Sequence, residues 1–330
     1  MSSEPGGPAA NPPPSLLTVT PAHRGLRADA FLAIALPFLS RTRVRQKIQT
    51  GESLLNGRRY ATSARLAAGD VLTVSWRSAP PSRSTRQFHV LFQDEHIIAV
   101  DKPAGAASHP AGRFQSDTVI QFVRELLAAE TRASLSQDGD FFPRLVNRLD
   151  VFTSGVILAA TTGLALREMQ SLAACGKINK RYVALVEGVV AGEHGMIDLP
   201  LGPDSKSSTN LRMAPREDGL ASVTDFVVLR RLPAHTLLAV FPRTGRQHQI
   251  RAHLAAAGHP VCGDLLYKDE SLFLRYQRAG GVPDPSLPLR HCLHAEEVEF
   301  LQPFTGRRIL IRSALPSDFL DILHDVKSPA

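Results

Sequence analysis

Residues 148–155 read RLDVFTSG and lead directly into the apolar segment 156–160, VILAA. That segment is short, contains β-branched residues and is bounded by turn-forming residues, which predicts a buried strand. Asp150 is therefore expected in a turn at the edge of the core, where a carboxylate needs a partner. Arg246 is the candidate partner, because a guanidinium stays charged and can bind a carboxylate with two hydrogen bonds.

Other short motifs occur in a fixed order on both sides of this stretch. They are DEH at 94–96, DKPAG at 101–105, HP at 109–110, KRYVA at 180–184, TGRQHQIRAH at 244–253, GHP at 258–260, GD at 263–264, Tyr267 and LHA at 293–295. With RLDVFTSG, this ordered set resembles the RluA-type pseudouridine synthases over residues 88 to 318. One departure is Asn147, where many members of that family have His.

The resemblance implies an RNA pseudouridine synthase, an isomerase that converts uridine to pseudouridine without a metal or other cofactor. It implies that Asp150 is the essential aspartate, which attacks the sugar or removes a proton from it. Tyr182 offers an aromatic face to a flipped uracil, and its hydroxyl is the candidate base for the C5 proton. Arg246 is implied to keep Asp150 ionised, since a nearby cation lowers a carboxylate pKa by about 1 to 3 units.

Residues near these three are candidates for substrate binding. Arg148 resembles the family residue that enters the RNA helix in place of the flipped nucleotide, and a phosphate clamp is the alternative role. Gly155 is expected to allow a close approach of backbone. The remaining candidates are Leu149, Thr153, Lys180, His248 and Arg251.

The N-terminal part of the chain carries a cationic helix. Ser40 and Gly51 are placed to begin and end it, and an apolar helix is expected before it over 27–36. The cationic helix presents Arg41, Arg43, Arg45 and Lys47, and no acidic residue occurs between positions 30 and 51. With a tight turn at Asn56-Gly57 and a strand over 71–75, this arrangement resembles the S4-type RNA-binding domain. That favours phosphate contacts for the four cations over a plain solvated face.

The expected fold class is α+β, with a catalytic domain built on a mixed, largely antiparallel sheet, because predicted strands outnumber the interspersed helices. Strands are expected over 88–92, 96–100, 182–190, 221–229 and 236–241, and helices over 164–174 and 246–257. The expected domains are a disordered tail over 1–15, the S4-type α/β domain over 16–77, a linker over 78–87 and the pseudouridine synthase domain over 88–325.

Composition narrows the class of protein further. The net charge of +7 over 330 residues favours a polyanionic partner. The cysteines, Cys175, Cys262 and Cys292, form no CxxC pair, which argues against a disulfide framework or a zinc site. His248, His253 and His259 do not share a helix face, so no metal is expected. No apolar run approaches the ~18 residues of a membrane helix, so no membrane span is expected. The widely spaced cysteines fit a reducing cytoplasm. No GxxxxGK(S/T) or GxGxxG motif occurs, so we expect no nucleotide cofactor, and we expect a monomer.

The RNA target stays open between two kinds. Members with an S4-type domain commonly modify large-subunit (23S) ribosomal RNA, whereas Asn147 and GRF at 112–114 also resemble members that act on tRNA. A non-catalytic RNA-binding ribosome-assembly factor on the same scaffold is a second class of function. The presence of Asp150, Tyr182 and Arg246 together favours the enzyme.

Overall fold

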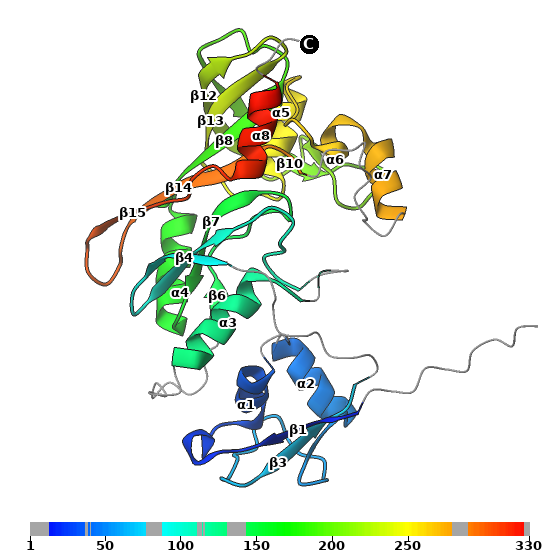
Figure 1. Ribbon diagram of the computed structural model, residues 1–330, viewed down its shortest axis with the longest axis vertical. Coiled ribbons are helices and arrows are strands. Elements are labelled where there is room, and N and C mark those ends of the chain that lie inside the picture. The colour runs from blue at the N-terminus through cyan, green and yellow to red at the C-terminus, as the bar shows by residue number, and fades with distance from the viewer. Residues whose placement is uncertain are drawn as a thin grey trace, which may run out of the picture. The chain divides into compact units, whose positions relative to one another are not determined.

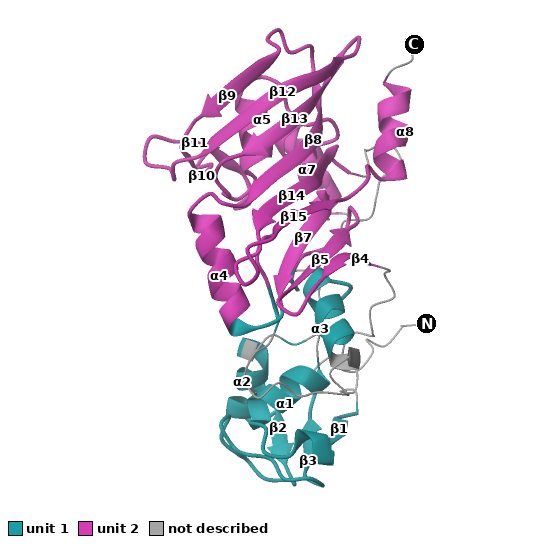
Figure 2. Ribbon diagram, turned by 90° about the vertical axis from the view of Figure 1, so that its left-hand side faces the viewer, with its two compact units in different colours: residues 1–87, 109–144, 161–163 teal, residues 88–108, 145–160, 164–330 magenta. Residues whose placement is uncertain are grey.

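The computed structural model describes residues 13–36, 39, 41–76, 88–110, 114, 116–130, 143–278 and 290–326. The chain divides into two compact units, shown in teal and magenta in Figure 2. Unit 1 comprises residues 1–87, 109–144 and 161–163, and unit 2 comprises 88–108, 145–160 and 164–330. The linker expected over 78–87 and most of the expected tail lie outside the described residues, although β1 already begins at Ser15.

Unit 1 contains a small antiparallel sheet and two helices that share one core. The strands β1 (Ser15–Thr18), β3 (Val71–Val74) and β2 (Ser53–Leu55) lie in the order β1-β3-β2. The helices are α1 (Ala28–Ala35) and α2 (Arg41–Thr50), preceded by the short helix η1 (Pro21–His23) (Figure 1). Val44 and Ile48 of α2 are buried in this core, as their spacing of four residues predicts. The expected cationic helix is therefore confirmed.

Two local signals of the sequence explain how elements of unit 1 begin and end. Asn56 and Gly57 both have positive φ angles, 48° and 76°, and form the expected tight turn after β2. The third helix of the unit, α3 (Val119–Glu130), starts after Thr118, whose amide and hydroxyl both donate to Oε1 of Gln121. This contact satisfies a backbone donor that the helix itself leaves unpaired.

Unit 2 is built on a sheet of ten strands that contains residues from most of its length. The strands are β4 (His89–Gln93), β5 (Ile97–Lys102), β6 (Arg144–Leu145), β7 (Ser154–Ala160), β8 (Asn179–Glu187), β9 (His194–Asp198), β12 (Val223–Arg231), β13 (His235–Pro242), β14 (Leu293–Leu301) and β15 (Arg308–Arg312). Their main order is β4-β5-β7-β14-β8-β13-β12-β9, while β15 pairs with β14 and β6 pairs with β7. Since β7–β14 pairs parallel and its neighbours pair antiparallel, the expected mixed, largely antiparallel sheet is confirmed.

Helices and a small hairpin accompany this sheet. They are α4 (Gly163–Ala174), α5 (Gln249–Ala256), α6 (Leu265–Lys268), α7 (Glu270–Arg278) and α8 (Ser317–Asp325), with the pair β10 (Leu201–Pro203) and β11 (Met213–Pro215) (Figure 1). Met169 of α4 packs with Leu158 of β7 and Phe300 of β14 in one apolar cluster. On the far strands, α5 lies against β12 and β13. Among the described residues, none of the helices is both long and apolar enough to cross a membrane.

The segment 156–160, predicted to be a buried strand, lies in β7, whose seven residues are all buried. Gly155 has a φ of 111°, and a Cβ atom there would lie 2.1 Å from the carbonyl oxygen of Ala295 on β14. A side chain cannot be placed at that position without moving the parallel strand. The prediction that Gly155 permits a close backbone approach is confirmed, and this contact fixes β7 against β14.

Candidate active site

The loop that carries Asp150 is fixed by hydrogen bonds on both sides of that residue. The amide of Thr153 donates to the carbonyl of Asp150 at 3.1 Å, which closes the expected turn. The Ser108 hydroxyl lies 2.8 Å from the carbonyl oxygen and 3.2 Å from the amide nitrogen of Leu149. Asp150 therefore stands between two anchored residues at the entrance to β7.

Lys102 is the second anchor of this loop, and its role was not predicted. Its side chain is fully buried at the end of β5. The ammonium donates to three backbone carbonyls, those of Pro103 at 3.1 Å, Ala106 at 2.7 Å and Val151 at 2.9 Å. A buried ammonium needs such acceptors, because an unpaired charge in a core is costly. The DKPAG motif thus supplies a cation that holds the residue after Asp150 in place.

Arg251 connects two carboxylates at the centre of the site. Its Nη1 donates to Oδ2 of Asp150 at 2.8 Å, while Nε and Nη2 bind the two oxygens of Asp264 at 2.5 and 2.8 Å. The Arg251 side chain is 8% exposed and that of Asp150 is 27% exposed. The guanidinium is therefore nearly removed from water, whereas the Asp150 carboxylate is open to a ligand.

The prediction that Arg246 is the partner of Asp150 is wrong. Arg246 is exposed, and its Nε donates to the carbonyl of Ala221 at 3.2 Å. The helix expected from residue 246 begins only at Gln249, because residues 246–248 form a turn in which His248 has a φ of 53°. Arg251, expected among the substrate-binding residues, takes the role assigned to Arg246.

A detail of the sequence distinguishes these two arginines. Ile250 and Leu254 are four residues apart, a spacing that places both on one face of a helix, and both are buried. Arg251 is adjacent to Ile250 and three residues before Leu254, so helical periodicity also places it inward. A buried guanidinium requires a carboxylate, and the GD motif supplies one in Asp264. The helical spacing therefore indicates that Arg251 is buried and needs a carboxylate partner.

Two histidines surround the Asp150 carboxylate. Nε2 of His248 lies 3.8 Å from Oδ1 of Asp150, and its Nδ1 lies 3.3 Å from the Tyr267 hydroxyl. His291 Nε2 is 2.8 Å from the Thr153 hydroxyl. Burial lowers the pKa of His248, and burial together with the Arg251 charge lowers the pKa of His291 to about 3. Near neutral pH both rings are therefore uncharged, and Arg251 is the permanent cation beside Asp150.

The pKa of Asp150 lies below its ordinary value. Burial raises the pKa of this carboxyl. The charge of His248, which becomes protonated at low pH, and the permanent charge of Arg251 outweigh that effect and favour the ionised form. Burial likewise raises the pKa of Asp264, and the Arg251 charge and hydrogen bonds outweigh it. Of the described side chains, only Arg251 hydrogen-bonds Asp150, and it does so at Oδ2. Oδ1 of an ionised carboxylate is thus available to a substrate.

Tyr182 and Lys180 approach the site from β8. They are two residues apart on one strand and so share a face of the sheet. Tyr182 is buried, and burial followed by the Asp150 charge raises the pKa of its phenol, so the hydroxyl keeps its proton. Burial lowers the pKa of Lys180. Because the Asp150 charge affects the pKa of this phenol, Tyr182 lies within electrostatic range of the aspartate.

The other predicted substrate-binding residues differ in exposure. Arg148 is exposed, so its side chain is accessible to a large ligand. Leu149 and Thr153 are buried, and their hydrogen bonds go to Ser108 and His291, which makes them part of the loop's support. Asn147 also supports the loop, because its Oδ1 accepts from the amide of Leu158 on β7 at 2.7 Å.

The cations of α2 lie in unit 1 and have closer acidic neighbours than expected. Nε of Arg45 is 3.3 Å from the buried carboxylate of Asp29, which Arg27 also binds. Lys47 donates to Glu52 at 3.0 Å and lies over the Trp76 ring. The expectation that no acidic residue balances these cations is wrong. Asp29 and Glu52, which lie just outside residues 30–51, pair with Arg45 and Lys47. Arg43 is exposed, and the Arg41 side chain is outside the described part of the structure.

Comparison with known proteins identifies the class to which this site belongs. The family model for RNA pseudouridylate synthase matches residues 96–256. Ribosomal large subunit pseudouridine synthase D of Xanthomonas campestris pv. campestris is 32% identical over 300 residues, covering 89% of this chain and 87% of that protein. An uncharacterised RNA pseudouridine synthase of Mycobacterium bovis is 36% identical over 300 residues, covering 89% of this chain and 92% of that protein.

A solved structure shows the same fold. Human RNA pseudouridylate synthase domain containing 1 aligns with a TM-score of 0.53 at 22% identity, over 76% of this chain and 98% of that one. With the sequence relatives, these findings show that the chain belongs to the RNA pseudouridine synthase family. It is an isomerase that acts on RNA, as the resemblance in its motifs predicts.

Proposed function

We propose that Asp150 is the catalytic residue and that it reacts through Oδ1. Pseudouridine formation breaks the bond between N1 of uracil and C1′ of ribose, joins C5 to C1′, and transfers the C5 proton away. The first step needs a nucleophile or base beside the sugar. The observation that supports Asp150 most directly is its ionised carboxylate, held at Oδ2 by Arg251 and partly exposed.

Tyr182 is the proposed platform for the uracil and the proposed acceptor of the C5 proton. An aromatic ring stacks on any base, and its hydroxyl is the polar group that this residue adds to the site. Because its raised pKa keeps the phenol protonated in the free protein, the hydroxyl must pass its own proton to solvent water as it takes the C5 proton. Lys180 lies two residues before Tyr182 and therefore shares its face of the strand.

Access to the target requires that the nucleotide leave its stack. Turning a nucleotide out of a helix costs a few kcal/mol, which RNA contacts have to offset. Arg148 is the proposed residue that occupies the vacated position, since it is exposed and only two residues from Asp150. In unit 1, the small sheet with α1 and α2 is the proposed S4-type module, with Arg41, Arg43 and Arg45 toward phosphates.

Large-subunit ribosomal RNA is the proposed substrate. The relative in Xanthomonas campestris is named a ribosomal large subunit enzyme, and its similarity covers 89% of this chain. The alternative of tRNA rested partly on Asn147, but that side chain binds the backbone of β7 and so has a structural role. The net charge of +7 suits either polyanion.

The test combines chemistry with target mapping. Total RNA from cells lacking the gene is mapped for pseudouridine, and the gene is restored as wild type or as Asp150→Asn. We expect one or more sites of the large-subunit RNA to lose pseudouridine without the gene and to regain it only with wild type. Loss confined to tRNA would contradict the proposed substrate, and full restoration by Asp150→Asn would contradict the proposed catalytic residue.

A further inference from the structure

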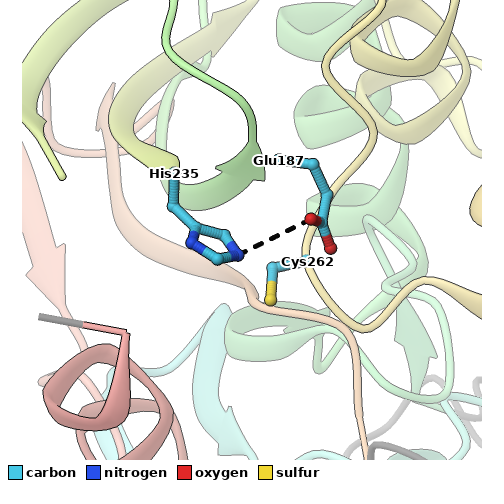
Figure 3. A group of neighbouring side chains, drawn as sticks. All are labelled: Glu187, His235 and Cys262. Carbon is cyan, nitrogen blue, oxygen red and sulfur yellow. Dashed lines mark ion pairs between the residues drawn. The ribbon is translucent and has the colours of Figure 1, made fainter. Parts of the chain in front are cut away.

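A second cluster of polar side chains lies in unit 2 and has no part in the proposed reaction. It consists of Glu187, His235 and Cys262, shown as sticks in Figure 3. One carboxylate oxygen, one ring nitrogen and the sulfur all lie within 4.8 Å of one another. Nε2 of His235 is 3.6 Å from Oε2 of Glu187, the contact drawn as a dashed line. Among the described residues, this is the one such group of potential metal ligands.

The backbone brings these three residues together. Glu187 is the last residue of β8 and His235 the first of β13, and the two are directly opposite in the antiparallel register. Cys262 is fixed to the same strand, because its amide donates to the carbonyl of Leu185 at 2.8 Å. The amide of Glu187 donates to the carbonyl of Pro260 at 2.9 Å. The positions of the three side chains are thus set by main-chain hydrogen bonds.

Glu187 and Cys262 are each held by a further residue outside the cluster. The ammonium of Lys268 donates to Oε1 of Glu187 at 2.7 Å, which leaves Oε2 toward His235. The amide of Cys292 donates to the carbonyl of Cys262 at 2.8 Å, which holds the backbone of Cys262 on its other side. Outer contacts of this kind orient metal ligands in proteins.

We propose that Glu187 Oε2, His235 Nε2 and Cys262 Sγ bind one zinc-like divalent ion, with water in the fourth position. Thiolate and imidazole together select zinc over magnesium or calcium, which prefer oxygen ligands. Two ligands each about 2.0–2.1 Å from a tetrahedral ion are about 3.4 Å apart, close to the separation of the nitrogen and oxygen here. The sulfur lies within 4.8 Å of both other ligand atoms and has to move closer to them to complete the site. All three residues are partly exposed, so the ion has a route of entry.

The position of this cluster gives the ion a structural role. It would join β8, which carries Tyr182, to β13 and to the segment that leads to Asp264 two residues after Cys262. Asp264 in turn binds Arg251, the partner of Asp150. Bound metal would therefore stabilise the segment behind the active site without entering the reaction.

The experiment measures metal binding directly on the full-length chain. The protein is reduced with a phosphine, freed of metal with a chelator and titrated with zinc chloride against a chromophoric zinc chelator. We expect one saturable site in wild type and at least about a 100-fold weaker site in Cys262→Ser and in His235→Gln. Cobalt(II) added in place of zinc should give sulfur-to-metal charge-transfer absorption that Cys262→Ser lacks. Zinc should also raise the Tm of wild type but not of these variants.

Two matched controls make the result specific. Cys175 is an exposed thiol and His194 an exposed imidazole outside the cluster, so Cys175→Ser and His194→Gln should bind zinc as wild type does. Circular dichroism checks that each variant folds, and the partly exposed His235 provides the test should Cys262→Ser not fold. No saturable site in wild type, or unchanged affinity in both cluster variants, would overturn the proposal.

Discussion

The two cationic regions of this protein hold their charges in opposite ways. In unit 2, the Arg251 side chain is 8% exposed and donates three hydrogen bonds, one to Asp150 and two to Asp264. In unit 1, the Arg45 side chain on α2 is 51% exposed and meets Asp29 in a longer contact of 3.3 Å. The first arrangement fixes the ionisation of one carboxylate, whereas the second keeps charge where a polyanion can reach it.

This difference predicts different costs when a charge is removed. Removing one member of a buried pair leaves an uncompensated charge and typically costs about 3–5 kcal/mol. Exposed pairs typically contribute only about 0.2–1 kcal/mol, and salt screens them. Variants in unit 2 should therefore affect stability and turnover, and variants on α2 should affect RNA affinity and its dependence on salt.

The largest effect is expected for Asp150→Asn. The change keeps the size of the side chain and removes the charge that the reaction is proposed to need, so pseudouridine formation should be abolished. Binding of RNA should stay within a few-fold of wild type. Tritium release from RNA labelled at C5 of uridine measures the first quantity, and filter binding measures the second. Residual turnover above about a hundredth of wild type would refute Asp150 as the nucleophile.

Tyr182→Phe should lower turnover by about 10²–10⁴-fold, the contribution typical of a positioned acid or base. The phenyl ring keeps the stacking surface, so RNA affinity should change little. The same tritium-release assay measures the loss under single-turnover conditions. Normal turnover would leave Tyr182 as a platform and would assign the C5 proton to another acceptor.

Arg251→Met and Arg246→Met form a matched pair within one motif. Arg251→Met should lower the free energy of unfolding by about 3–5 kcal/mol, because it leaves Asp150 and Asp264 without their shared cation. Arg246→Met should change it by less than about 0.5 kcal/mol, as an exposed substitution does. Urea denaturation at pH 7 measures both. Equal effects of the two substitutions would contradict the assignment of Arg251 as the partner.

The contrast between these arginines also shows how far the sequence predicts the structure. Segment 156–160 was recognised as a buried strand because its signal is local, and Gly155 because its motif lies beside that strand. The partner of Asp150 was missed because 101 positions separate it from Arg251, and only the register of the fold brings them together. The motifs contain Asp150, His248 and Arg251, which the structure brings together, but they do not indicate which of these residues contact one another.

The same limit applies to the cluster of Glu187, His235 and Cys262. Cysteine spacing predicts no metal site, because a local CxxC signal is absent. The ligands come instead from the end of one strand, the start of another and a loop, which the pairing of β8 with β13 aligns. The Lys102 anchor was likewise invisible, since its acceptors are backbone carbonyls that no side-chain pattern reveals.

A smaller effect is expected from pH on stability. The pKa of His291 is lowered to about 3 by burial, so the unfolded chain binds a proton that the folded chain does not between about pH 6.5 and 3. Stability should therefore fall as the pH drops through this window, by up to about 1.4 kcal/mol per pH unit for this residue. From about pH 3.8 downward, Asp150 adds a further loss, because the unfolded chain then protonates this carboxyl while the folded chain keeps it ionised.

Urea denaturation at pH 7 and pH 5 measures this dependence. His291→Gln should reduce the number of protons bound on unfolding by up to one, so the free energy of unfolding should depend less steeply on pH. The slope will not vanish in the variant, because burial also lowers the pKa of His248, His253 and His294. An identical slope in wild type and His291→Gln would show that His291 is not held neutral in the folded protein.

The smallest effect is expected on α2, where the cations differ among themselves. Arg45→Gln should weaken RNA binding and make the slope of log affinity against log salt shallower by about 0.7 to 0.9, the change for one phosphate contact. Lys47→Gln is the matched control on the same helix, because the Lys47 side chain is 13% exposed and donates to Glu52 and to the carbonyl of Ser75. Its substitution should leave the salt slope unchanged and lower stability slightly.

Turnover at saturating RNA should be normal in both variants, since Asp150 and Tyr182 belong to unit 2. If Arg45→Gln binds RNA with the affinity and salt slope of wild type, Arg45 serves only to neutralise the buried Asp29, and the proposed phosphate-binding face of α2 does not include it.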